Sequence, residues 1–192
     1  AAHAEVAVVF LGLPARCESE GFDRDDLDLP VAQLRLLDAV VAVNPRTVVV
    51  LSNGGVVALP FASTVPAILE GWLLGQAGGA ATADVLFGAV NPSAKLTETI
   101  PVRVHDTPAY LAYPGEFGHV RYGEGLFVGY RWYDARCLEV AFPFGHGLSY
   151  TSFDYADAVA TVNSAGGLDV SVTVTNTGDV AGREIVQVYT SL

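Results

Sequence analysis

Two short runs of mostly apolar residues, separated by a long acidic loop and a helical pattern, open the chain. The runs cover residues 5–11 and 47–51 and are rich in valine. Both are too short for helices, which is typical of strands in the middle of a parallel sheet, and we expect the first to be a central strand. Between them, Pro30 suits the first position of a helix, and Asn44-Pro45 suits its end. Strand, crossover helix and strand form one βαβ unit, so the sequence predicts an α/β fold.

The loop that follows the first run is crowded with acidic side chains. Residues 17–30, CESEGFDRDDLDLP, hold six carboxylates and one arginine, Arg24: the acids are Glu18, Glu20, Asp23, Asp25, Asp26 and Asp28. In open α/β sheets, loops at the carboxyl ends of the strands carry the ligand chemistry. The turn Ser52-Asn53-Gly54-Gly55 ends the second run and falls at the same edge. We therefore expect the acidic loop to carry a catalytic acid.

The rest of the chain changes character twice. Short strands are expected at residues 56–59 and 65–70, and a packed helix at 80–87, whereas 101–150 is rich in aromatic residues and lacks regular periodicity. Alternating apolar and polar residues at 168–175 predict a half-buried antiparallel strand, and 184–190 predicts another. These patterns predict a domain of residues 1–150 and the start of a β domain over 151–192. Two or three strands are too few to close a sandwich, so the second domain is expected to be truncated.

Composition and motifs exclude several functions. The formal net charge is −11, which argues against nucleic acid or an anionic membrane as a partner. No Cys/His cluster has the spacing of a metal site, so no metal is expected. A flavodoxin-like nucleotide-binding domain would need a phosphate cradle after the first strand, and the acidic loop there would repel phosphate. The glycine-rich turn at 75–79 lacks the residues of a phosphate-binding motif, so no cofactor is expected.

Five separated segments resemble the glycoside hydrolase family 3 β-glucosidases, in that family's order. They are ESEGFDR at 18–24, LSNGG at 51–55, GQAGG…ADVLFG…NPSAKL at 75–96, YGEGLFVGYRWYD at 122–134 and FPFGHGLSYTSF at 142–153. The resemblance implies a three-layer α/β sandwich with a mostly parallel sheet, of which this chain holds the second half. It also implies that residues 151–192 begin a fibronectin type III-like β domain. The family's aspartate nucleophile lies on a barrel domain that this chain does not contain.

The same resemblance implies the chemistry. A retaining glycosidase uses two carboxyl groups about 5–5.5 Å apart, one as nucleophile and one as proton donor to the leaving oxygen. The family motif places the general acid/base at the glutamate before glycine, which is Glu20 here, with Glu18 as the rival. Substrate-binding roles are expected for Glu18, Phe22 and Arg24. Arg24 either holds the loop through a carboxylate pair or belongs to a solvated surface pair.

Two functional hypotheses remain. In the first, the chain is part of a retaining exo-acting β-glycosidase that hydrolyses terminal β-D-glucosyl residues, with a β-glucoside and the missing barrel domain as its partners. On its own, without the nucleophile, the chain is then expected to be inactive. In the second, it is a non-catalytic carbohydrate-binding or interaction module that retains the fold. Homo-oligomerisation and the compartment, cytoplasmic or secreted, are left open.

Overall fold

The computed structural model describes residues 1–191 and divides them into two compact units. The first unit combines residues 1–78 with 96–145, and the second combines 79–95 with the chain after Gly145. Among the described residues, no helix is long and apolar enough to cross a membrane.

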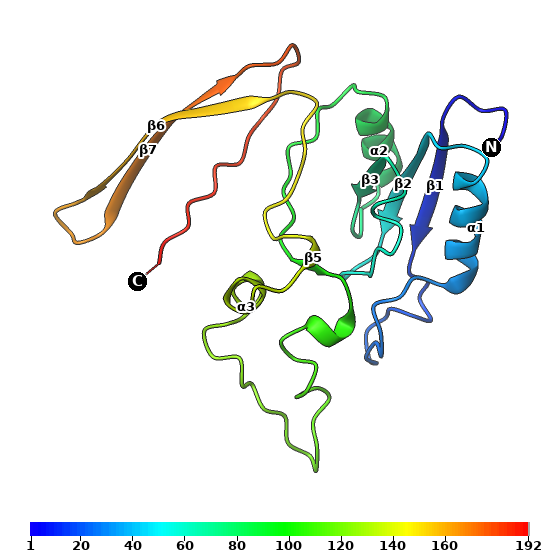
Figure 1. Ribbon diagram of the computed structural model, residues 1–192, viewed down its shortest axis with the longest axis horizontal. Helices are drawn as coiled ribbons and strands as arrows, with labels where there is room; N and C mark the ends of the chain where they lie inside the picture. The colour runs from blue at the N-terminus through cyan, green and yellow to red at the C-terminus, as the bar shows by residue number, and fades with distance from the viewer. Residues whose placement is uncertain (192) are drawn as a thin grey trace. The chain divides into compact units, whose positions relative to one another are not determined.

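A three-stranded parallel sheet forms the centre of the first unit (Figure 1). Its strands are β1 (Ala7–Gly12), β2 (Thr47–Ser52) and β3 (Ala67–Glu70), in the order β1-β2-β3. Helix α1 (Val31–Val41) crosses from β1 to β2 and packs on one face of the sheet. The predicted βαβ unit and parallel sheet are therefore confirmed.

Side chains alternate along β1 between the core and the solvent. Val9 and Leu11 are buried with Leu37 of α1, whereas Val8 and Phe10 on the other face are 42% and 65% exposed. Within residues 1–191, β1 lies at the end of the sheet with β2 as its single neighbour. The expectation of a central strand was therefore wrong for this chain, because a valine-rich run suits a half-covered edge strand as well as a covered central one.

Side-chain amides fix both ends of α1 against the sheet. The Gln33 side chain accepts a hydrogen bond from the Gly12 backbone N–H and donates one to the Gly12 carbonyl, both at 2.9 Å. At the other end, the buried Asn44 amide donates to the carbonyls of Ala1 and Ala4. The first contact ties the helix start to the end of β1, and so it holds together the two ends of the acidic loop.

Several elements of the first unit differ from the sequence expectations. Residues 56–59 form no strand; Val57 and Leu59 are buried by loop packing, and the Ala58 N–H donates to the Leu27 carbonyl. The aromatic region contains elements that the sequence did not reveal: β4 (Ile100–Pro101), the 3₁₀ helix η1 (Val104–Asp106), α3 (Tyr130–Arg136) and β5 (Val140–Phe142). β4 and β5 pair across about forty residues of chain, and such nonlocal pairing leaves no local periodicity.

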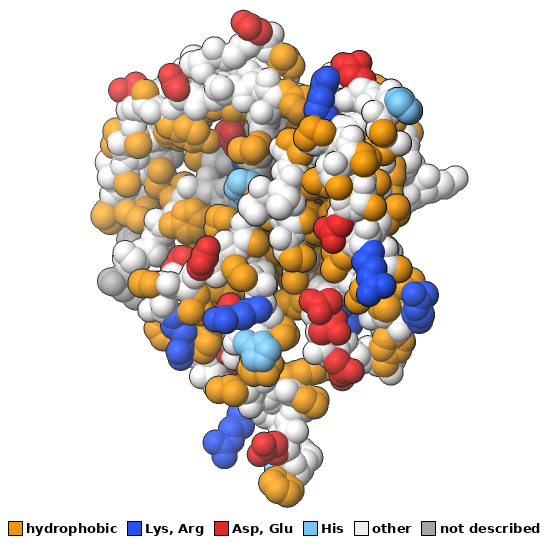
Figure 2. Space-filling view, turned by 45° about the vertical axis from the view of Figure 1, so that its right-hand side comes forward, with side chains coloured by type: hydrophobic (Ala, Val, Ile, Leu, Met, Phe, Trp, Pro, Cys, Tyr) orange, Lys and Arg blue, Asp and Glu red, His pale blue; other side chains and the backbone are white. Residues whose placement is uncertain are grey.

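Between η1 and α3 the chain makes a long irregular excursion with many exposed apolar side chains. Leu111, Phe117 and Tyr122 are 96%, 97% and 90% exposed. Figure 2 shows hydrophobic side chains over much of the visible face. Contiguous apolar surface is uncommon on monomeric soluble proteins and often belongs to a contact site.

The second unit contains α2 (Gly78–Leu86) and an antiparallel pair, β6 (Phe153–Val162) and β7 (Leu168–Asn176). Helix α2 and strand β7 confirm the expected elements, whereas residues 184–190 contain no strand. Alternation alone does not give residues 184–190 a strand partner, because ladder hydrogen bonds need a neighbouring strand. The division at residue 150 and the fibronectin type III-like assignment stay predictions.

A half-buried lysine ties the segments of the second unit together. Lys95 Nζ lies 2.7 Å from the Gly147 carbonyl oxygen and 3.1 Å from Glu184 Oε1. Burial lowers the pKa of the neighbouring His146, and the positive charge of Lys95 lowers it further. The contacts of Lys95 join residues 95, 147 and 184, which all belong to the second unit.

Candidate active site

Three connections meet at the carboxyl edge of the parallel sheet. The acidic loop leaves β1, the Asn53-Gly54-Gly55 turn leaves β2, and residues 71–75 leave β3. The Leu13 N–H donates to the Ser52 carbonyl at 3.2 Å, and the Gly71 N–H donates to the Leu51 carbonyl at 3.0 Å. The acidic loop and the Asn53-Gly54-Gly55 turn therefore lie at the same edge of the sheet, as the sequence predicted. Backbone hydrogen bonds join the neighbouring connections at this edge.

Glu18 is bound to the turn after β2. Its Oε2 accepts a hydrogen bond from the Gly54 N–H at 2.7 Å, and its Oε1 accepts one from the Gly55 N–H at 2.9 Å. A Cβ at position 54 would lie 3.0 Å from the Glu18 carboxyl carbon, so glycine allows this close approach. Both oxygens of Glu18 are thus engaged by the protein itself.

Arg24 lies behind Glu18 with its guanidinium largely buried. Its Nη1 donates to the Val56 carbonyl at 3.0 Å and lies 3.9 Å from Glu18 Oε1, and the two side chains are 19% and 21% exposed. Nη2 is buried and has no hydrogen-bond partner among residues 1–191. Adding further protein domains cannot uncover a group that is already buried here. The arrangement therefore favours a role for Arg24 in holding the loop over contact with a sugar.

Glu20 and Phe22 lie at the exposed tip of the same loop. The Glu20 side chain makes no hydrogen bond or ion pair within the described part of the chain, and Phe22 is 49% exposed. Gly21 between them has φ +94°, a conformation that side-chain-bearing residues rarely adopt. The chain turns there and leaves the Glu20 carboxyl exposed to solvent.

The irregular segment between η1 and α3, which we call the aromatic excursion, also interacts with this loop. Interaction of its Tyr113 hydroxyl with the Asp23 carboxylate is the main reason why the pKa of Tyr113 is raised above its ordinary value. Burial and the negative charges of Asp23 and Asp25 raise this pKa further. The cluster of aromatics was visible in the sequence, but the partner of Tyr113 was not, because the two residues are far apart along the chain.

Glu70 is a site residue that sequence reasoning missed. It is the last residue of β3, and its carboxylate accepts hydrogen bonds from the Trp72 N–H at 2.9 Å and from the fully buried Asn53 side chain at 3.4 Å. Burial raises the pKa of Glu70, and the hydrogen bonds from Trp72 and Asn53 oppose that shift. A glutamate at the end of a predicted strand, on the edge that carries the acidic loop, was the available signal.

Glu70→Gln is expected to change how stability depends on pH. Below the carboxyl's ordinary pKa of 4.5, Glu70 is protonated in both the folded and unfolded states. Above it the unfolded chain ionises first, so the folded protein binds more protons and its free energy of unfolding falls until the folded carboxyl also ionises. Glutamine does not titrate and removes this fall. Thermal unfolding of both proteins at several pH values checks the prediction, and equal slopes above pH 4.5 would contradict it.

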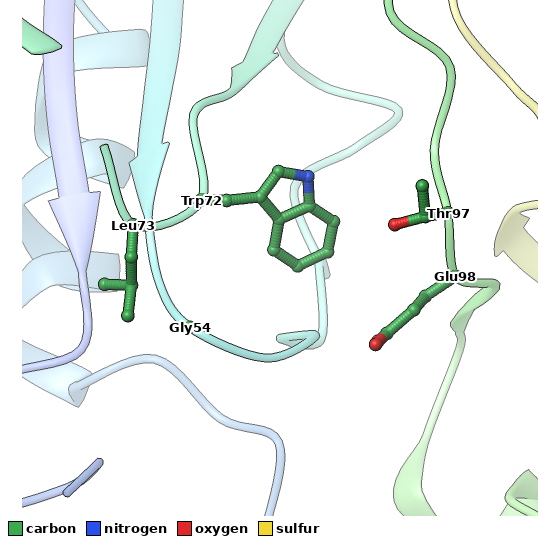
Figure 3. A pocket seen from close by; sticks show the side chains of 5 residues that line it. All are labelled: Gly54, Trp72, Leu73, Thr97 and Glu98. Carbon is green, nitrogen blue, oxygen red and sulfur yellow. The ribbon is translucent and has the colours of Figure 1, made fainter. Parts of the chain in front are cut away.

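A shallow cavity of about 280 Å³ opens next to the Asn53-Gly54-Gly55 turn. It is lined by Gly54, Trp72, Leu73, Thr97 and Glu98. Figure 3 shows the Trp72 indole between Leu73 on one side and Thr97 and Glu98 on the other. The cavity adds an aromatic face and a carboxylate to the edge that bears the acidic loop. No group of three or more His, Cys, Asp or Glu residues in the described part of the chain is arranged to hold a metal ion.

Comparison with known proteins identifies the family. Residues 1–150 match the model of the glycosyl hydrolase family 3 C-terminal domain. The chain belongs to glycosyl hydrolase family 3. This confirms the resemblance read from the sequence. Because the match includes the acidic loop and the two turns beside it, the edge described above is part of a glycosyl hydrolase family 3 domain.

Curated relatives in this family are much longer than the chain. It is 53% identical over 190 residues to an exo-α-(1→6)-L-arabinopyranosidase of Bifidobacterium longum, and 53% identical over 192 residues to the thermostable β-glucosidase B of Acetivibrio thermocellus. Each match covers 98% of this chain and 25% of the relative. The chain thus spans about a quarter of the length of these glycoside hydrolases.

A solved structure agrees with the fold. The crystal structure of a Bifidobacterium adolescentis GH3 β-glucosidase is 54% identical in sequence, with a TM-score of 0.90 over 93% of this chain and 27% of that one. The mixed α/β fold with a parallel sheet is therefore that of a glycosyl hydrolase family 3 C-terminal domain.

Proposed function

We propose that the chain supplies the general acid/base, Glu20, to a retaining exo-acting β-glycosidase. The single observation that carries this proposal is the contrast within one loop at the carboxyl edge of the sheet. Glu18 is bound by two backbone amides, whereas Glu20, two residues later, has a free and exposed carboxyl. A proton donor must reach the glycosidic oxygen of a bound substrate, and Glu20 is the glutamate of this motif that is available to do so.

In the proposed reaction Glu20 acts twice. It first gives its proton to the leaving glycosidic oxygen while a nucleophile carboxylate, supplied by a part of the enzyme outside this chain, bonds to the anomeric carbon. Glu20, now ionised, then takes a proton from the water that displaces the sugar from the nucleophile. Phe22, exposed beside Glu20, is proposed to contact the substrate, since an aromatic ring offers an apolar surface to the C–H face of a sugar.

The proposed substrate is a terminal β-D-glucoside. The similarity to the Acetivibrio thermocellus β-glucosidase B and to the Bifidobacterium adolescentis β-glucosidase supports it. An α-L-arabinopyranoside is the second candidate, supported by equal identity to the Bifidobacterium longum arabinopyranosidase. We propose that the sugar ring is recognised mainly outside this chain, because the acidic loop exposes a single aromatic side chain, Phe22.

A hybrid enzyme tests the proposal. In it, the chain replaces the matching quarter of the Acetivibrio thermocellus β-glucosidase B, which is 53% identical. The hybrid is expected to hydrolyse 4-nitrophenyl β-D-glucoside, whereas the remaining three quarters of the relative alone are expected to be inactive. A second hybrid with the Bifidobacterium longum arabinopyranosidase is expected to keep the sugar preference of its own recipient.

Two outcomes would favour the non-catalytic alternative. One is a hybrid that is folded, as judged by its melting temperature, and yet inactive. The other is an active hybrid whose turnover does not depend on Glu20. If both hybrids instead share one sugar preference, then this chain selects the sugar, and the proposed division of roles is wrong.

A further inference from the structure

We propose that Glu18 is a positioning residue that fixes the root of the acidic loop so that Glu20 is presented in one orientation. The inference rests on the proposed function of Glu20. Glu18 does not touch the substrate in this account. Its carboxylate joins the acidic loop to the turn after β2. This contact fixes the position of the loop tip relative to the carboxyl edge of the sheet.

The contacts of Glu18 hold both oxygens of its carboxylate against the turn after β2. One oxygen meets the Gly54 N–H at 2.7 Å and the other meets the Gly55 N–H at 2.9 Å. Hydrogen bonds to an ionised acceptor are short and stronger than neutral ones, and two parallel bonds also fix direction. The Arg24 guanidinium, 3.9 Å away, supplies the positive charge that offsets the partly buried carboxylate. Arg24 is itself tied to the Val56 carbonyl, so the loop is joined to the same turn twice.

A second anchor lies on the other side of Glu20. Arg24 Nη1 donates a hydrogen bond to the Val56 carbonyl at 3.0 Å. Residues 19–23 therefore span two fixed points, Glu18 and Arg24, and the Glu20 side chain projects from the short exposed segment between them. A short segment fixed at both ends samples far fewer conformations than a free loop of the same exposure.

Positioning matters for this reaction because proton transfer requires the donor within hydrogen-bond reach of the leaving oxygen. A misplacement of about 1 Å can lower the rate of an enzymatic step about 10²-fold. The loss in the first step should be selective: a leaving group that departs without a proton does not need Glu20 in place for that step, whereas a poor leaving group does. A purely structural role for Glu18 would instead lower both rates together.

The test compares Glu18→Gln with a matched control in the hybrid enzyme. Glutamine keeps the size of the side chain but places an amide donor against a backbone N–H, so one of the two hydrogen bonds is lost. Asp25→Asn removes the same charge from an exposed position of the same loop and is the control. We expect Glu18→Gln to lower kcat for phenyl β-D-glucoside about 10–100-fold. KM for phenyl β-D-glucoside and kcat/KM for 2,4-dinitrophenyl β-D-glucoside, which reports the first step alone, are expected to change less than about 3-fold. The same limit is expected for both substrates with Asp25→Asn.

Arg24→Met provides a second variant, which removes the other anchor, the hydrogen bond to the Val56 carbonyl, and keeps an unbranched side chain. It is expected to show the same dependence on the leaving group with a smaller loss, and this keeps the inference testable if Glu18→Gln unfolds. Equal losses on both substrates, or no loss on either, would overturn the positioning role.

Sodium azide separates the roles further, because a small anion can occupy the space left by a missing acid/base. With 2,4-dinitrophenyl β-D-glucoside, whose first step needs no acid, azide is expected to accelerate Glu20→Ala and not Glu18→Ala. If Glu20→Ala hydrolyses phenyl β-D-glucoside normally, the proposed function fails, whatever Glu18→Gln does.

Discussion

Replacing Glu20 with alanine is expected to lower kcat of the hybrid enzyme for phenyl β-D-glucoside about 10²–10⁴-fold. The reason is that general acid catalysis contributes a factor of that size when the leaving group needs a proton. The 2,4-dinitrophenolate leaving group departs without one, so the first step with that substrate should be largely spared. Values of kcat for phenyl β-D-glucoside and of kcat/KM for 2,4-dinitrophenyl β-D-glucoside, measured with the same enzyme preparation, check the prediction.

Glu18→Ala is the decisive comparison for the assignment of the acid. Glu18 is bound to the Gly54 and Gly55 amides, and Glu20 is free. The two roles are reversed if Glu20→Ala keeps its activity, Glu18→Ala loses turnover with phenyl β-D-glucoside, and azide accelerates Glu18→Ala with 2,4-dinitrophenyl β-D-glucoside. A circular dichroism spectrum and a melting temperature close to those of the unmodified hybrid are required for both variants.

Leu37→Ala is expected to destabilise the chain by about 2–5 kcal/mol. Leu37 is the one helix residue of α1 that is fully enclosed, at 1% exposed, and it packs with Val9, Leu11 and Val49 of the sheet. Truncation removes buried methyl groups and leaves a cavity that rigid strands cannot close. Urea unfolding of the chain, followed by circular dichroism, measures the loss.

The neighbouring residue gives a matched control. Leu36 lies on the same helix but is 55% exposed, so Leu36→Ala removes the same atoms from a largely solvated position. It is expected to change the free energy of unfolding by about 0.5 kcal/mol or less. A similar loss for both variants would mean that α1 does not pack on the sheet through Leu37.

Local patterns predicted the central elements of the first unit because those elements obey local rules. Pro30 at the helix start, Asn44-Pro45 beyond its end and the valine-rich runs place α1, β1 and β2 within a few residues of their observed bounds. The same rules failed where apolar residues are buried without strand pairing, as at Val57 and Leu59. They also failed for β4 and β5, whose partners are distant in the chain.

In the acidic loop, too, the sequence predicted some features and the tertiary structure decided others. The six carboxylates of the loop can be read from the sequence. The position of the loop at the carboxyl edge also follows from the sequence, because a loop that follows a parallel strand emerges at that edge. The family motif also identifies Glu20 and Glu18 as the two candidates for the general acid/base. Which of the two is bound by the protein and which is free depends on the amides of Gly54 and Gly55, and no pattern within residues 17–30 contains that information.

The sequence by itself determined the α/β class, the family and the loop that bears the acids, since these depend on periodicity, turn chemistry and ordered motifs. Tertiary structure alone decided that Glu18 is anchored, that Arg24 is buried, that Tyr113 reaches Asp23 and that Glu70 titrates in a desolvated site. The physical reason is that hydrogen bonding and desolvation act between groups close in space. The partners of these four residues come from neighbouring connections of the sheet and from the aromatic excursion, and folding alone brings them together.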